Sequence, residues 1–238
     1  MNGLRNDFER MSVLIITRDA KQQLIKQLDS LYGIGDLEIA EIDSVYETVL
    51  ESLAVAFRHT NNKYYHEGGV TKFNPLHVGQ WTMFLYQIAR NLYLSSSSNI
   101  DLCDKIYGLS KSVSSADIYY EIKMPKIWLI EHPQGSIMGR AEYSDYFFFM
   151  QGCTVGANGG NYPKLGKHVC MLSNSKVLGD CTVGDYVILA ANSYIIDEDI
   201  PSYSIVFGQH PNITTKSINK MKYMELTGSI FKSEDDIV

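Results

Sequence analysis

Histidines are the side chains of this 238-residue sequence best suited to acid–base chemistry near neutral pH. His132 stands out because it lies in residues 130–135 (IEHPQG), directly after a carboxylate, Glu131. An imidazole with a pKa near neutrality can take a proton from a hydroxyl group, which is otherwise a poor nucleophile. A His-Pro pair is also typical of an exposed loop, so the local residues leave both interpretations of His132 open.

The cysteines and the remaining histidines do not indicate a metal site. The other five histidines have no mutual spacing typical of metal ligands. The cysteines show no CxxC or Cys/His ligand spacing, and we expect four small buried apolar groups: Cys103, Cys153, Cys170 and Cys181. The sequence therefore predicts neither disulfides nor a bound metal.

Length and composition limit the class of protein. The chain is long enough for one large domain or two small ones, and 45% hydrophobic with 20% charged residues is typical of globular proteins. No apolar run approaches the roughly 20 residues that cross a bilayer, so we expect no membrane insertion. A net charge of −6 disfavours nucleic-acid binding. Residues 1–10 lack the apolar stretch of a signal peptide, so we expect a cytoplasmic protein.

Residues up to 115 have the periodicity of helices. Apolar residues recur at spacings of three and four, which predicts amphipathic helices in three places: residues 20–32, 42–58 and 75–94. A further short helix is expected over about residues 100–110. The stretch 64–74, with two glycines and several polar residues, is expected to be a loop. We therefore predict a helical N-terminal domain over residues 1–115.

Beyond Asp117 a six-residue repeat replaces the helical period. Every sixth residue is aliphatic or methionine: Leu165, Met171, Val177, Val183, Leu189 and Ile195. The position four residues later is small or β-branched: Val169, Ser175, Cys181, Val187 and Ser193. Going backwards, the first series continues more loosely: Val155, Phe149, Tyr143 and Ile137. Such a period is typical of short parallel strands stacked coil on coil around three faces, and it predicts a left-handed parallel β-helix over residues 116–212, with residues 213–238 as a C-terminal tail.

From about residue 117 to 211 the chain resembles the serine acetyltransferases and related hexapeptide acyltransferases. The resemblance is carried by these segments: IEHPQG (130–135), MG (138–139), CTVG (153–156), YPKL (162–165), KVLGDCTVG (176–184) and VFG (206–208). Asp117 precedes His132 by fifteen residues, the separation that the family uses. The resemblance implies an α+β protein in which an all-helical N-terminal domain precedes a left-handed parallel β-helix of hexapeptide repeats.

The resemblance also implies direct acetyl transfer from acetyl-CoA, as co-substrate, to a hydroxyl group of a small acceptor. In such enzymes a histidine deprotonates the hydroxyl and a carboxylate orients the imidazole. His132 would be the base and Asp117, or failing that Glu131, its partner. Asp117 follows two serines, which suits a turn or a cap equally well. Covalent catalysis by Cys153 is the competing mechanism, but the repeat places Cys153 at an inward, small-residue position.

The acceptor site is expected at residues 156–161 (GANGGN), which interrupt the repeat. In the resembled enzymes a loop here borders the acceptor pocket and carries a histidine and a basic residue just before the Pro-Lys pair. This sequence has Tyr162 and Asn161 instead, so it lacks the cation that would bind the carboxylate of an amino acid. The acceptor stays open between L-serine and a sugar or nucleotide-linked sugar, to which Tyr162 and Asn161 would offer stacking and hydrogen bonds.

The family binds CoA in a groove between neighbouring β-helices, and the resemblance carries Gly156, Ser173 and Ala191 over to that groove. Ser173 and Ala191 are equally suited to corners that need small residues. Lys216 is a candidate for the CoA phosphates, although a solvated lysine is ordinary in its polar stretch. A groove of this kind needs several chains, so we expect a homotrimer, or two trimers paired through their helical domains, with His132 near a subunit boundary. The alternative from another class is a catalytically silent β-helix that serves as a scaffold or binds a ligand.

Overall fold

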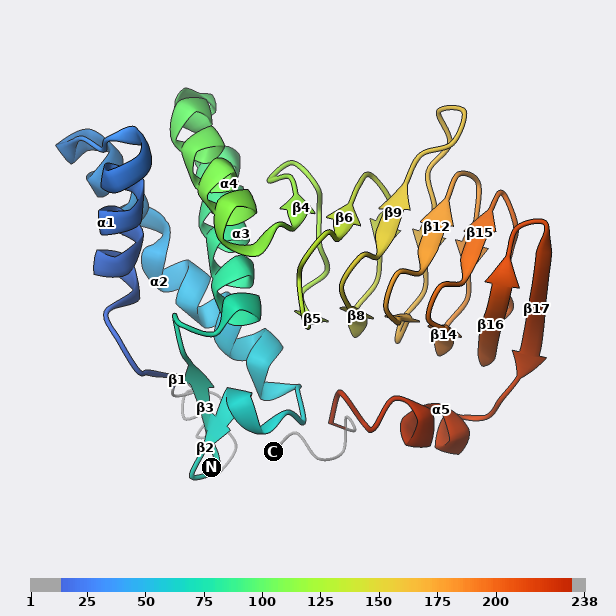
Figure 1. Ribbon diagram of the computed structural model, residues 1–238. Helices are drawn as coiled ribbons and strands as arrows, with labels where there is room; N and C mark the ends of the chain where they lie inside the picture. Colours follow the sequence, from blue (N-terminus) through green and yellow to red (C-terminus); the bar gives the residue numbers. More distant parts are fainter. Residues whose placement is uncertain (1–13, 233–238) are drawn as a thin grey trace, which may run out of the picture.

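Helices occupy the first half of the chain and stacked strands the second (Figure 1), in a computed structural model that describes residues 14–232. Residues 1–10, on which the expectation about export rests, lie outside the described residues. The long helices are these: α1 (Ala20–Tyr32), α2 (Asp36–Arg58), α3 (Val78–Ser95) and α4 (Ile100–Ser114). None of the helices within residues 14–232 has the length and apolar character needed to cross a membrane.

Helix α2 begins six residues before its predicted start. Its first turn is stabilised by a capping contact and not by buried apolar residues. The Glu38 side chain accepts a hydrogen bond from the main-chain N–H of Gly35, at 3.0 Å, and this contact stabilises the start of the helix. The buried apolar stripe starts only at Ile42, and apolar spacing alone therefore missed the first turns. The predicted α3 and α4 are also found, with α4 extending to Ser114.

The stretch 64–74, predicted to be a loop, instead contains a small sheet, so that prediction is wrong. After a 3₁₀ turn, η1 (Lys63–Tyr65), the strands β2 (His66–Glu67) and β3 (Val70–Phe73) pair as a hairpin, and β1 (Leu14–Ile16) pairs with β3 in parallel. Gly68 and Gly69 form the two-residue turn, with φ of 58° and 82°. This left-handed conformation favours glycine. A second 3₁₀ turn, η2 (Ser97–Asn99), joins α3 to α4.

The second half of the chain is a parallel β-helix of about five coils, which confirms the predicted fold class. Its strands lie on three faces. The β5 face holds β5 (Trp128–Ile130), β8 (Phe147–Phe149), β11 (Cys170–Met171), β14 (Val187–Leu189) and β16 (Ser204–Gln209). The β6 face holds β4 (Asp117–Ile118), β6 (Ile137–Met138), β9 (Thr154–Gly156), β12 (Lys176–Leu178) and β15 (Tyr194–Ile196). The β7 face holds β7 (Glu142–Tyr143), β10 (Lys164–Leu165) and β13 (Thr182–Val183).

The interior of the β-helix follows the predicted repeat with one shift. All six inward positions predicted from 165 to 195 are buried, and so are the small positions between them. Ile137, however, is 46% exposed, while its neighbour Met138 is 1% exposed and pairs in register with Val155. The block from Met138 to Tyr143 is one residue short, so extending a strict six-residue period backwards selects the wrong residue.

Close stacking of the coils explains the glycines that follow the inward residues. A Cβ added to Gly184 would lie 2.5 Å from the main-chain nitrogen of Ser202, and one added to Gly166 would lie 2.7 Å from the carbonyl carbon of Gly184. Because real Cβ contacts are longer than this, each coil can approach the next only where the side chain is absent.

The region predicted as a tail folds back along the β-helix. It contains β17 (Asn212–Ser217), which pairs antiparallel with β16, and α5 (Lys220–Leu226), which runs back toward the helices (Figure 1). The Tyr223 ring packs edge-on against Tyr186, and Phe231 packs edge-on against Tyr146. We name residues 218–232 the return segment. The domain limits 1–115, 116–212 and 213–238 stay a prediction.

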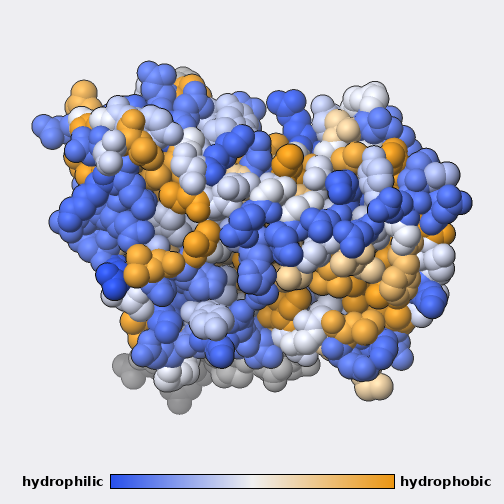
Figure 2. Space-filling model, in the orientation of Figure 1, coloured by the Kyte–Doolittle hydropathy of each residue, from blue (hydrophilic) through white to orange (hydrophobic). Residues whose placement is uncertain are grey.

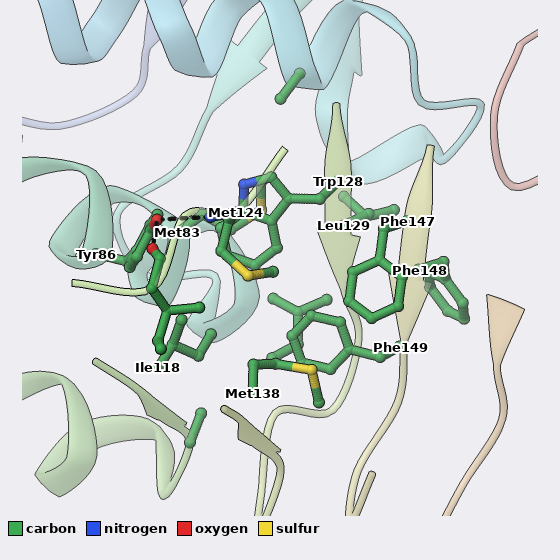
Figure 3. Close-up of a cluster of buried hydrophobic side chains, with 14 of the residues drawn as sticks. Met83, Tyr86, Ile118, Met124, Trp128, Leu129, Met138, Phe147, Phe148 and Phe149 are labelled. Atoms are coloured by element: carbon green, nitrogen blue, oxygen red, sulfur yellow. Dashed lines mark hydrogen bonds between the residues drawn. The ribbon is translucent and has the colours of Figure 1, made fainter. Parts of the chain in front are cut away.

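An apolar cluster joins the helices to the first coils (Figure 3). The Trp128 ring stacks on Phe149 with an interplanar angle of 2° and meets the edge of Tyr86 from α3. The Tyr86 hydroxyl donates to the carbonyl of Ile122 and accepts from the main-chain N–H of Met124. These contacts hold the segment before β5. They thereby fix β5 and the position at which residues 131–136 begin.

Candidate functional site

One edge of the β-helix is built by the corners that lead from the β5 face to the β6 face. The corners are residues 131–136, 150–153, 172–175 and 190–193. Main-chain hydrogen bonds stack them: Gly152 N to Gln134 O, Asn174 N to Gln151 O and Asn192 N to Ser173 O, at 2.8–2.9 Å. We name this edge the His132 edge.

His132 lies in a corner that differs from the others on this edge. The three later corners have four residues and one left-handed residue each, at Gly152, Asn174 and Asn192. The first corner has six residues and two left-handed positions, Gly135 and His132 itself, with φ of 51° at His132. Left-handed non-glycine residues recur at the corners of this β-helix, so the length of the corner, and not the φ of His132, distinguishes it from Asn174 and Asn192. The extra residues leave the His132 side chain exposed at the edge.

Asp117 begins β4, on the coil next to this corner. Its main-chain N–H donates to the carbonyl of Ser136 at 2.8 Å. Its carboxylate accepts from the Tyr107 hydroxyl at 2.6 Å and from the Lys111 ammonium at 2.9 Å, both in α4. Helix α4 therefore fixes the candidate carboxylate through two hydrogen bonds.

Glu131 is held by a different element. Its Oε1 accepts from Asn62 Nδ2 at 2.8 Å, just before η1. Within residues 14–232 no hydrogen bond joins the His132 ring to Glu131 or to Asp117. Both candidate carboxylates are thus hydrogen-bonded to polar groups of the helical half, Asp117 to α4 and Glu131 to Asn62.

A second imidazole, His77, shares the electrostatic environment of this corner. Burial lowers the pKa of His77, the charge of Glu131 opposes that shift, and His132 adds to it. Its Nδ1 accepts from the main-chain N–H of Gln80, at 3.3 Å, and so caps α3. A neutral ring that accepts at Nδ1 carries its proton on Nε2. Nothing in the spacing of His77 and His132 indicates this interaction, because only the fold brings residue 77 near the corner.

The candidate CoA residues lie on one edge and one face of the β-helix and on the hairpin of β16 and β17. Ser173 and Ala191 lie in corners of the His132 edge, and Gly156 ends β9 on the adjoining β6 face. Lys216 lies on β17, where its Nζ is 5.5 Å from the centre of the Phe207 ring. Ser173 and Ala191 are thus on one edge with His132, whereas Lys216 belongs to the hairpin at the far end of the coils.

The acceptor candidates lie on another edge. Residues 157–163 connect the β6 face to the β7 face and project from the coils as a small hairpin (Figure 1). Asn158 and Asn161 pair through two main-chain hydrogen bonds, and Gly159 and Gly160 form the turn between them with φ of 57° and 88°. Asn161 and Tyr162 are exposed. One chain therefore does not bring them together with His132.

The cysteines do not offer a nucleophile. All four are buried, and burial raises the pKa of the Cys153 thiol, the opposite of the shift that activates a catalytic thiol. The Sγ of Cys153 lies 3.6 Å from Ser175 Oγ inside the coils. In the described part of the chain, no three His, Cys, Asp or Glu side chains are grouped so that they could hold a metal ion.

Comparisons with known proteins point to one family. Over 144 residues the chain is 27% identical to the serine acetyltransferase of Staphylococcus aureus (strain Mu50), covering 58% of this chain and 64% of that protein. The serine acetyltransferase of Neisseria gonorrhoeae has a TM-score of 0.66 at 18% identity, covering 87% of this chain and 84% of that one. The chain is serine acetyltransferase-like in sequence and fold. A serine acetyltransferase in complex with CoA has a TM-score of 0.63 at 18% identity, with 82% and 83% covered.

No protein-family profile matches this serine acetyltransferase-like chain. The chain spans 64% of the length of the curated relatives that it matches. The residues that sequence reasoning missed, Asn62, Tyr107 and Lys111, all come from the helical half. Nothing in their spacing indicates a contact with the β-helix, because such contacts depend on how the two halves pack.

Proposed function

We propose that the protein is an acetyl-CoA-dependent O-acetyltransferase that acts on a small hydroxylated acceptor, with His132 as general base. The observation that carries the proposal is the six-residue corner that presents His132 at the edge of a serine acetyltransferase-like β-helix. The stacking of the coils does not account for this corner. Reactive groups are commonly placed on such irregular segments of a rigid scaffold.

In the proposed reaction the His132 imidazole takes the proton of the acceptor hydroxyl as its oxygen bonds to the thioester carbonyl carbon. The carbon–sulfur bond breaks, and the sulfur of CoA leaves and takes up the proton. Asp117 or Glu131 orients the imidazole and stabilises its protonated form. General base catalysis of this kind contributes roughly 10²–10⁴-fold to the rate.

We infer that the acceptor carries hydroxyl groups and no carboxylate. Asn161 and Tyr162 offer an amide and an exposed phenol, which suit a sugar or a nucleotide-linked sugar through hydrogen bonds and stacking. L-serine remains the competing acceptor, since the relatives are named serine acetyltransferases. A carboxylate would need a cation that neither Asn161 nor Tyr162 supplies.

The proposed active form is a homotrimer, or two trimers paired through the helices. His132 and Tyr162 lie on different edges of one chain, so a pocket that uses both needs the edge of a neighbouring chain. Hydrophobic residues gather over the β-helix on the face drawn in Figure 2, as is common at contacts between chains. Gly156, Ser173 and Ala191 would line the CoA groove and Lys216 would meet its phosphates. We place this enzyme in the cytoplasm.

Two measurements test the proposal. CoA and acetyl-CoA should raise the melting temperature, because a ligand that binds the folded state stabilises it. Free thiol should then be released from acetyl-CoA when sugars or nucleotide sugars are supplied. Thiol release with L-serine alone would overturn the inferred acceptor class. The absence of both a thermal shift and thiol release would identify a silent β-helix.

A further inference from the structure

The side chain of Asn62 makes two contacts with opposite chemistry. Its Oδ1 accepts from the main-chain N–H of Tyr64 at 2.9 Å and caps η1. Its Nδ2 donates to Glu131 Oε1 at 2.8 Å. The cap needs only an acceptor, whereas the contact with Glu131 needs a donor. A change that keeps one function and removes the other is therefore available at this position.

The segment just before Asn62 is fixed by the return segment. The main-chain N–H of Asn61 donates to the carbonyl of Ile230, and that of Lys232 donates to the carbonyl of His59, both at 2.8 Å. Thr60, which is fully buried, pairs with Phe231 in a short antiparallel bridge. Residues near the end of the described chain thus hold the segment from which Asn62 reaches the β-helix.

The hydrogen bond from Asn62 to Glu131 involves the corner that carries the proposed base, His132. Glu131 is the first residue of that corner, and its main-chain N–H donates to the carbonyl of Phe149 at 3.1 Å. Its backbone is therefore held by the β-helix, while its carboxylate is held by Asn62. Apart from Asn62, no side chain in residues 14–232 forms a hydrogen bond with that carboxylate.

We propose that Asn62 is a positioning residue, through which the helical half and the return segment set the place of the Glu131 carboxylate beside His132. This inference rests on the proposed function, since it assigns Asn62 a part in the same reaction. It also gives the return segment a role: residues 230–232 support the active corner through residues 59–62.

Replacing Asn62 by aspartate separates positioning from capping. The Asn62→Asp side chain still caps η1, because aspartate caps as well as asparagine, but it loses the donor and sets a second carboxylate against Glu131. We expect kcat to fall about ten- to a hundredfold, as for the loss of a supporting contact at an active site, with KM for acetyl-CoA within about twofold of the parent. Asn62→Ala should lower kcat less, because it leaves no opposing charge.

A role in capping alone predicts the reverse order. Asn62→Asp would then match the parent and only Asn62→Ala would lose activity, through a less stable η1. The matched control is Asn61→Asp, which adds the same charge one residue away on an exposed side chain, and it should keep kcat within about twofold. An Asn62→Asp variant as active as the parent, or an Asn61→Asp control that loses activity to the same extent as Asn62→Asp, would overturn the inference.

A double-variant cycle identifies the partner. In a Glu131→Gln background the aspartate of Asn62→Asp regains a donor, so we expect it to cost less than about twofold in kcat there. An equal cost in both backgrounds would show that Asn62 acts elsewhere. Failure of this inference can be told apart from failure of the proposed function. If the proposed function is wrong, the parent protein shows no acetyl transfer. If only this inference is wrong, the parent is active and the Asn62→Asp variant is equally active.

Discussion

The first corner of the His132 edge and the corners that follow it occupy equivalent places on the β-helix but are built differently. The later corners have four residues, and small left-handed residues such as Gly152 and Asn174 turn the chain. The first has six residues, and its carboxylate is held by a side chain from the helical half. Coil stacking alone accounts for the later corners and does not account for the first.

This difference separates the features of a corner that the β-helix needs for stacking from features that it does not need. In a stack of coils each corner rests on the next through main-chain hydrogen bonds. Where a corner is lengthened and supported from outside, its side chains serve another purpose. Comparison along one edge of a repeat protein can therefore identify a functional segment without a bound ligand.

Replacement of His132 is expected to have the largest effect. His132→Asn keeps a residue that tolerates positive φ, so it removes the base without straining the corner. We expect a 10²–10⁴-fold loss of acceptor-dependent thiol release, with a melting temperature within about 1 °C of the parent. His210→Asn changes another exposed histidine, on the hairpin of β16 and β17, and should keep full activity. If His132→Asn kept activity within a few-fold, the first corner would be no more functional than the later ones.

Replacement of the inward residue beside the first corner should reduce stability instead. Met138→Ala removes a side chain that is 1% exposed, and we expect it to lower the free energy of unfolding by about 2–5 kcal/mol. Ile137→Ala, one residue away and 46% exposed, should cost less than about 1 kcal/mol. Denaturant unfolding of both variants tests this order.

Equal losses would contradict the shift of the repeat at Met138. A loss for Ile137→Ala that grows as the protein is diluted would have a different meaning: it would place Ile137 in a contact between chains, since association stabilises the folded state by mass action.

Most of the β-helix could be predicted because each coil contacts its neighbours through the same positions. The repeat therefore appears directly in the sequence from Leu165 to Ile195. Before that stretch it is interrupted by the hairpin at residues 157–163 and shifts at Met138, where a block is one residue short. The hairpin of β2 and β3 was missed although Gly68 and Gly69 are a typical two-residue turn, because the short strands on either side alternate too weakly.

The site could be predicted only in part. His132 and Asp117 could be selected as candidates because their motif and separation lie within the repeat region, and their catalytic roles stay a prediction. The residues that hold the two carboxylates, Asn62, Tyr107 and Lys111, are separated from the repeat by their place in the helical half, and no local pattern links them to it. Contacts between differently built regions are set by tertiary packing, which a single sequence does not display.

The smallest expected effect concerns Lys111, which holds the other candidate carboxylate. Hydrogen bonds from Lys111 to Asp117, and then to Tyr107, raise the pKa of its ammonium group above the usual 10.5. A lysine whose pKa is raised on folding stabilises the folded state fully below its unfolded pKa, and this contribution is lost as the pH rises through its folded pKa. The side chains of Lys111 and Asp117 are 46% and 33% exposed, so the pair should contribute only about 0.2–1 kcal/mol.

Comparison of Lys111→Gln with the parent therefore tests both stability and the identity of the carboxylate. The difference in unfolding free energy should be constant from about pH 7 to 9 and should shrink above about pH 10.5. Because the Tyr107 hydroxyl still donates to Asp117, we expect the variant to keep kcat within about threefold of the parent. A loss of kcat approaching that of His132→Asn would contradict this, since a weak exposed pair would then control the chemistry. It would also identify Asp117, rather than Glu131, as the carboxylate on which the imidazole depends.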